Sequence, residues 1–200
     1  MAIMLVLFGI VLVGGINAIR MQSQQSTFES AQADMRVIKD ALLGFVAING
    51  RLPCPSVTTL GVVNTGVANC TSYEGQLPWK TLGIKPLDAW GHLYTYRVTQ
   101  NFTVSIATAT PGDITVRNAP GTTDIATTIP VIVVSHGKNG QGALSLNGTP
   151  TPQPLANQTA ELQNLSLNDR IYQIGGDDLL MWIPSNVVKH YARKGGLLLP

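Results

Sequence analysis

The segment MAIMLVLFGIVLVGGI, residues 1–16, opens the chain and decides how the rest of it is arranged. It carries no charged side chain, and the first charge in the sequence is Arg20. Residues 22–48 are more polar but keep apolar residues at helical spacing. An apolar rod that becomes an amphipathic rod, followed by Gly-, Pro- and Thr-rich sequence, is typical of a membrane anchor that continues into a scaffold helix.

Three interpretations of the first segment are open. As a helix, residues 1–19 would rise about 28 Å, close to the roughly 30 Å of a bilayer's hydrocarbon core. A cleaved signal peptide would have a basic region before the apolar run and a small-residue cleavage site, which residues 14–18 match poorly. A buried core helix is possible, but at a chain terminus it is seldom apolar on every face. The pattern therefore favours an anchor over a signal peptide or a core helix.

The second half of the rod is predicted to be an amphipathic helix that ends near residue 50. Its apolar residues recur in steps of three and four and form one stripe: Phe28, Ala31, Met35, Ile38, Leu42, Phe45 and Val46. Gly50 can adopt the left-handed conformation that ends a helix, and Pro53 prevents continuation. The stripe needs a cover, and the β-rich sequence that follows is the only candidate.

Length and charge suggest the domain plan and the class of partner. Two hundred residues suit one domain plus an anchor, so we divide the chain into a helix over 1–50 and a globular β domain over 51–200, with a loop-rich insert over 51–90. The net charge is only +2, and the Lys and Arg residues are scattered. This charge pattern gives no indication of nucleic acid binding.

Two cysteines, Cys54 and Cys70, lie close together in a Pro-, Gly-, Asn- and Thr-rich stretch. Downstream of a membrane segment, such a pair favours a disulfide formed in an oxidising compartment. Two free thiols are the alternative. A metal site is less favoured, because the stretch has neither a CxxC pattern nor a nearby histidine.

The remaining sequence predicts short strands and a small helix. Residues 93–98 and 102–107 alternate in polarity and suggest a hairpin joined at 100–101. Further strands are predicted at 114–117, 129–134, 171–174 and 178–183, and a short helix at 186–193. Without β–α–β alternation, the expected fold is α+β, a small antiparallel sheet packed on one long helix.

Three tryptophans are candidate structural anchors. Trp79 and Trp90 lie in the irregular region, and Trp182 lies in the last predicted strand. Half-buried indole rings can hold a loop that has few regular hydrogen bonds. A carbohydrate-stacking pair is the alternative for the first two. Asp88, just before Trp90, is most simply a turn residue that accepts backbone N–H groups.

No catalytic or cofactor site is predicted. Ser135 and His136 are adjacent in sequence, so they do not form the usual nucleophile–base pair, and no G-x-S-x-G motif is present. The glycine-rich loop 137–142 lacks Walker spacing, and the three histidines have no metal-ligand spacing. Asp177 and Asp178 could bind Ca²⁺ or cap a turn, and the turn is favoured. The chain is therefore not expected to be an enzyme.

A family resemblance fits this plan. The apolar start, RLPCP (51–55), GQLPWKTLG (75–83) with DAWG (88–91), VVSHGKNGQG (133–142) and DDLLMWI (177–183) follow one another in the chain. Together they resemble type IV pilins and type II secretion pseudopilins over nearly the whole length. In that family the leader and the first mature residues would precede Met1. The late loop that binds Ca²⁺ in the major pseudopilins carries Lys138 and Asn139 here, so no metal is expected.

The resemblance implies a structural role in assembly. The subunit would sit in the bacterial inner membrane through one span, with its globular domain in the periplasm. After extraction by the assembly machinery, it would join other subunits in a periplasmic or cell-surface filament. The apolar side chains expected to pack against other subunits, or against inner-membrane lipid before assembly, are Met4, Leu5, Phe8, Val11, Leu12 and Ile16.

Three other functions stay open at this point. The first is a membrane-anchored periplasmic binding or adhesion module that does not polymerise. The second is a secreted hydrolase that uses Ser135 or His136. The third is a soluble β domain released after signal cleavage near Ala18.

Overall fold

The computed structural model describes residues 2–62, 70–165 and 169–196, and for residues 2–21 it describes the backbone alone. Within these ranges the elements are α1 (Ala2–Asn49), β1 (Glu74–Gln76), α2 (Trp79–Leu82), β2 (Thr95–Val98), α3 (Asn101–Val104), β3 (Ile114–Arg117), β4 (Asp124–Ile129), β5 (Val131–Ser135), α4 (Thr159–Gln163), β6 (Ile171–Gln173), β7 (Leu179–Ile183) and α5 (Ser185–Lys194). The chain is thus α+β, with a long helix at its N-terminus, as the sequence predicts.

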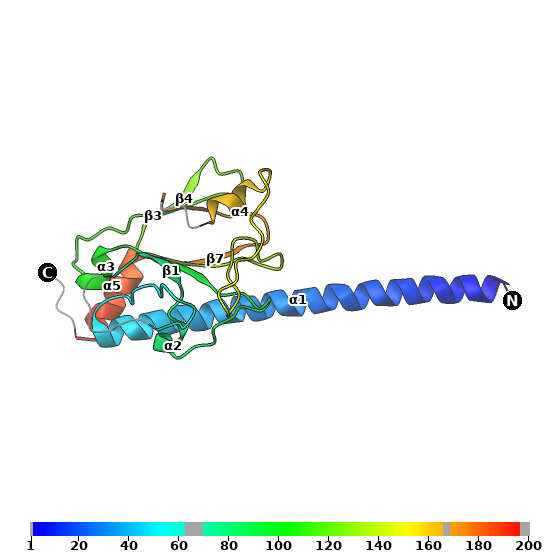
Figure 1. Ribbon diagram of the computed structural model, residues 1–200, viewed down its shortest axis with the longest axis horizontal. Helices are drawn as coiled ribbons and strands as arrows, with labels where there is room; N and C mark the ends of the chain where they lie inside the picture. The colour runs from blue at the N-terminus through cyan, green and yellow to red at the C-terminus, as the bar shows by residue number, and fades with distance from the viewer. Residues whose placement is uncertain (1, 63–69, 166–168, 197–200) are drawn as a thin grey trace.

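Helix α1 is a single continuous rod of 48 residues. At 1.5 Å per residue it is about 72 Å long. Its C-terminal half lies along the sheet domain, whereas its N-terminal half extends beyond that domain, with no other described element beside it (Figure 1). The two halves therefore have different surroundings although the backbone does not break between them.

The buried stripe of α1 starts later than the sequence pattern suggests. Five of the seven predicted stripe residues are buried: Ala31, Met35, Ile38, Leu42 and Val46. Phe28 is 43% exposed, because it lies a turn before the first residue that the sheet domain covers. Phe45 is half-buried, and Leu43 is buried although the stripe omitted it. The helix ends as predicted, with Gly50 at φ 68° and its N–H bonded to the Val46 carbonyl at 2.8 Å.

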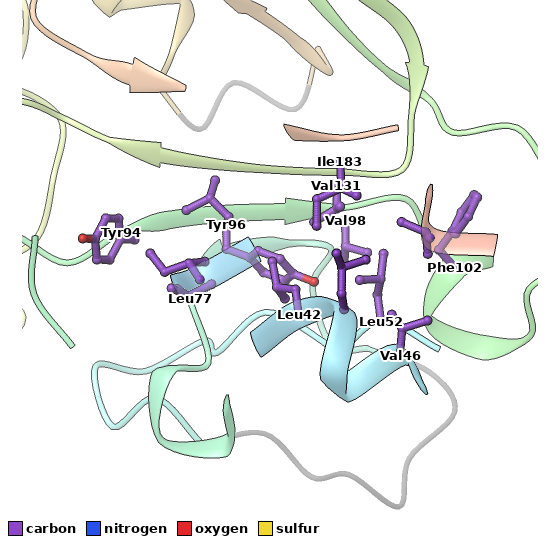
Figure 2. Packing of buried hydrophobic residues seen from close by; sticks show 14 of the residues in the cluster. Leu42, Val46, Leu52, Leu77, Tyr94, Tyr96, Val98, Phe102, Val131 and Ile183 are labelled. Carbon is purple, nitrogen blue, oxygen red and sulfur yellow. The ribbon is translucent and has the colours of Figure 1, made fainter. Parts of the chain in front are cut away.

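The first sheet has the strand order β1-β2-β5-β7, and every neighbouring pair in it is antiparallel. One face packs on α1 and α5 through an apolar core that includes Leu42, Val46, Tyr96 and Val133, and Figure 2 shows how α1, Leu52 and β2 meet there. All five residues of β5 are buried. This explains the unbroken apolar run in β5, because the strand is covered on both faces.

A second sheet, β4-β3-β6, covers the other face of the first sheet, as Figure 1 shows above β7. Ile114, Val116 and Tyr172 from this sheet share a core with Ile132 and Val134 of β5. The expectation of one antiparallel sheet is correct for the first sheet only, since β3 and β6 run parallel. The domain therefore has three layers: helices α1 and α5, the first sheet and the second sheet.

One of the strand predictions is wrong. Residues 102–107 do not pair with β2. Instead, Phe102 lies in the short helix α3, where its side chain is fully buried and its carbonyl accepts the Leu52 N–H at 2.8 Å. The predicted strand 129–134 is confirmed as β5, except that it begins after Pro130, which has no N–H to donate and separates β4 from β5. Strand β4 was not predicted at all.

A buried ion pair within the first sheet is linked to the second sheet by a hydrogen bond. Arg97 on β2 donates from Nη1 to Glu74 Oε2 on β1 at 2.5 Å, and Tyr172 on β6 donates from Oη to Glu74 Oε1 at 3.0 Å. All three residues are buried. Because removal of one partner would leave a buried charge uncompensated, this contact favours one arrangement of the sheets.

The predicted disulfide between Cys54 and Cys70 is present. It joins residues 54 and 70 within the 51–90 region, which also contains β1 and α2. The loop-entropy estimate for a bridge of this span is about 3 kcal/mol of stabilisation.

Candidate functional site

The first candidate site is the projecting half of α1. The residues predicted to pack against other subunits, from Met4 to Ile16, lie on this part of the helix, but their side chains fall outside the described residues. What the structure does describe is the backbone, which is helical from Ala2 onward without interruption. Within the part of the chain whose side chains the structure describes, no helix is both long and apolar enough to cross a membrane. The predicted membrane half therefore stays a prediction.

The second candidate site is a buried polar cluster at one end of the first sheet. It begins where Ser135 ends β5, and Ser135 Oγ donates to Asp88 Oδ2 at 2.6 Å. The other carboxylate oxygen of Asp88 accepts the N–H groups of Trp90 and His92, both at 2.9 Å. The turn role predicted for Asp88 is thereby confirmed.

Ser135 and His136 do not act on each other. His136 Nε2 is hydrogen-bonded to Thr95 Oγ1 at 2.9 Å, whereas Ser135 is bonded to Asp88. Both residues are only 1% exposed. A catalytic serine of the usual kind needs a histidine base within hydrogen-bond reach and access to substrate. Ser135 is bonded to a carboxylate instead of an imidazole, and its side chain is buried. The geometry therefore offers no support for the hydrolase alternative.

Asp177 and Asp178 hold neighbouring loops in place. Asp177 Oδ2 accepts the Asn139 backbone N–H at 2.8 Å, and Asp178 Oδ2 accepts from Asn164 Nδ2 at 2.8 Å. Glu161 joins them, with Oε1 accepting from Asn139 Nδ2 at 3.0 Å. The three carboxylates thus fasten loop 137–142 and the helix α4 segment to the start of β7.

Burial sets the protonation of this cluster. It raises the pKa of Asp178 to about 7. The hydrogen bond from Asn164 lowers this pKa, whereas the nearby charges of Glu161 and Asp177 raise it further. Burial also raises the pKa of Glu161. For His136, burial lowers the pKa to about 4. At neutral pH the imidazole is therefore neutral while Asp178 is close to half protonated.

Within the described residues, no group of three or more His, Cys, Asp or Glu side chains is placed to hold a metal ion. The carboxylates of Asp177, Asp178 and Glu161 bond instead to amide groups of the chain, and Asn139 supplies two of these donors. The arrangement serves to hold loops together. Sequence spacing could not have indicated Glu161 or Asn164, because they come from a separate segment and meet the cluster only in the folded domain.

The three tryptophans are half-buried. Trp79 Nε1 donates to the Thr59 carbonyl at 3.3 Å, and its ring occupies the space that a side chain at Gly61 would need. Trp182 packs against the core between the two sheets. These contacts agree with a role as structural anchors for Trp79 and Trp182, and the Trp90 backbone is fixed by Asp88.

No family model, curated protein or solved structure matches this chain.

Proposed function

We propose that this chain is a structural subunit, a minor pilin or pseudopilin, of a bacterial type IV pilus or type II secretion filament, and that it assembles through α1. The observation that carries the proposal is the division of α1. Its C-terminal half is buried against the sheets, and its N-terminal half continues beyond the domain (Figure 1). The sequence of that half has no charged residue before Arg20. A rod of this composition needs lipid or other protein around it.

Two further observations support this function. The Cys54–Cys70 disulfide suits an oxidising compartment such as the periplasm, where the globular domain would lie. Ser135 and His136, the two residues on which the hydrolase alternative depends, are buried inside the sheet domain. A role in assembly needs a folded domain and a helix that extends beyond it, and the chain has both (Figure 1).

The test compares the full chain with two arginine variants expressed in a bacterial host. Leu12→Arg places a charge in the projecting half, at a cost of about 2.5–3.5 kcal/mol for membrane insertion. Gln24→Arg places the same charge on an exposed, polar part of the same helix. We expect the wild type and Gln24→Arg to sediment with membranes and to form multimers on amine cross-linking. Leu12→Arg should lose both properties.

Two results would contradict the proposal in different ways. A wild-type chain that stays with membranes but cross-links to no other copy would be an anchored module that does not polymerise. A wild-type chain that remains in the soluble fraction would exclude both the filament subunit and the anchored module.

A further inference from the structure

Each sheet of the domain has one edge that another segment of the chain closes. In the first sheet, Ser56 closes the outer edge of β1 by exchanging two backbone hydrogen bonds of 2.8 Å with Gln76. In the second sheet, the Asn164 side chain closes the outer edge of β6. Its Oδ1 accepts the Gln173 N–H at 2.8 Å, and its Nδ2 donates to the Gln173 carbonyl at 3.0 Å.

The opposite edges, those of β7 and β4, are open. Apart from the strands with which they pair, no described segment makes a backbone hydrogen bond to residues 179–183 of β7 or to residues 124–127 of β4. Strand β7 reads LLMWI, without a charge or a proline. An apolar edge with unpaired N–H and C=O groups is a site to which another strand can add.

Both open edges lie on the same side of the domain. Tyr172 of β6 donates to Glu74 of β1, so β6 lies over β1. The strand orders β1-β2-β5-β7 and β4-β3-β6 then place β4 over β7. Ala126 of β4 agrees with this placement, because it packs against the same core as Leu180 and Trp182 of β7. One partner can therefore reach both open edges at once.

The open edge of β7 adjoins a pocket with apolar and basic walls. The pocket has a volume of about 320 Å³ and is lined by Met35, Arg36, Lys39, Leu180, Met181 and Trp182. Arg36 is exposed and Lys39 is half-buried, and neither has an ion-pair partner among the described residues. The pocket therefore favours a partner that brings an apolar side chain and an acidic one together.

Strand β4 carries such a pair of side chains. Ile125 is apolar but 48% exposed. The preceding residue, Asp124, is also exposed, and its Oδ1 accepts from Arg117 Nε at 3.0 Å. Among the described residues its Oδ2 has no hydrogen bond, so the carboxylate can accept from a second cation.

We propose that two copies of the chain pair through their open edges, with β4 of each copy added to β7 of the other. Ile125 enters the pocket, and Asp124 lies beside Arg36 and Lys39 of the other copy. Pairing of β7 with β7 is disfavoured, because it would bring the two basic pockets together. The exchange of β4 and β7 is reciprocal, so the contact is self-complementary and closes at two copies.

This pairing concerns the anchored subunit before it joins a filament. Each strand contact is only a few residues long, so we expect it to form between copies that α1 holds at high local concentration in one membrane. In this respect the pairing rests on the membrane position proposed above. It adds a contact between sheet domains that does not involve the projecting half of α1.

The first test places a photoreactive residue at position 125 of the full chain, and cells are illuminated before lysis. We expect an adduct of about twice the 21.3 kDa chain mass. In it, mass spectrometry should join position 125 of one copy to residues 179–183 or 35–39 of another. The same photoreactive residue at position 57, which is exposed beside the closed edge of β1, should give about tenfold less of this adduct.

The second test reverses charges in the chain that carries the photoreactive residue at position 125. Asp124→Lys should lower the adduct yield about fivefold, because it places a cation beside Arg36 and Lys39. Adding Lys39→Glu to Asp124→Lys restores one pair of opposite charges and should recover roughly half of the lost yield. Thermal unfolding of each variant checks that the domain is folded. If Asp124→Lys does not fold, Lys39→Glu alone should lower the yield by a similar factor.

The outcomes separate the pairing from the filament role. If the chain sediments with membranes but position 125 gives no adduct, or gives adducts only with β4 of another copy or with other proteins, the pairing is wrong and the filament role stands. Unchanged adduct yield in a folded charge-reversal variant also overturns the pairing alone. If the wild type remains in the soluble fraction, the filament role fails and the pairing fails with it.

Discussion

Single residues in the polar cluster make the stability of the domain depend on pH. Asp178 has its pKa raised to about 7 in the folded chain, against an ordinary value of 3.8. Between these values the folded state binds a proton that the unfolded state has released, so stability falls as pH rises. His136 acts in the opposite direction, because its folded pKa of about 4 lies below its ordinary 6.5. Between pH 4 and 6.5 the two effects offset each other.

Asp178→Asn should remove the contribution of Asp178 to the pH dependence of stability and leave the opposing contribution of His136. Without the carboxyl, the contribution of His136 remains, and the free energy of unfolding should rise from pH 4 to 6.5 more steeply than in the wild type. At about 1.4 kcal/mol per pKa unit, the free energy of unfolding of the variant should rise relative to that of the wild type by up to about 4 kcal/mol between pH 4 and 7. Urea unfolding at a series of pH values measures the difference. Parallel curves for variant and wild type would show that Asp178 titrates normally.

At the scale of an element, α1 is held by its buried stripe. Leu42 is fully buried at the centre of the core between α1 and the first sheet (Figure 2). Leu42→Ala should cost about 2–5 kcal/mol of unfolding free energy through lost burial and a residual cavity. Val37→Ala, on the exposed side of the same helix, should cost less than about 0.5 kcal/mol.

Urea unfolding of the full chain in mild detergent compares these two variants. Equal destabilisation by Leu42→Ala and Val37→Ala would mean that α1 does not dock on the sheet in the way the structure shows.

The elements also show what the sequence could and could not predict. Periodicity was sufficient for α1 and its end at Gly50, because a long amphipathic helix repeats its signal many times. It failed at Phe102, whose alternation with its neighbours suggested a strand. There the deciding contact comes from Leu52, 50 residues away in sequence, and local spacing of apolar residues cannot indicate such a contact.

The full polar cluster could not be predicted from the sequence for a similar reason. Asp177 and Asp178 were visible as a pair, and the turn role favoured for them agrees with their bonds to Asn139 and Asn164. That Glu161 would join them depends on how α4 packs against β6, and no motif encodes this.

For the whole molecule, the structure separates a stable domain from a helix that extends beyond it. Three packed layers and the Cys54–Cys70 disulfide stabilise the domain without any contribution from residues 2–21 that the structure describes. The proposed function therefore predicts that changes in the projecting half alter association while the domain stays folded. Leu12→Arg should accordingly keep the Cys54–Cys70 disulfide while it abolishes multimers.

The central claim is that the projecting half of α1 contacts other copies of this chain, and photo-cross-linking tests it most directly. A photoreactive residue is placed at position 12 of the full chain, and cells are illuminated before lysis. The account predicts an adduct of about twice the 21.3 kDa chain mass, in which mass spectrometry identifies peptides of a second copy. A membrane-bound chain that yields no adduct, or adducts with other proteins alone, would contradict it.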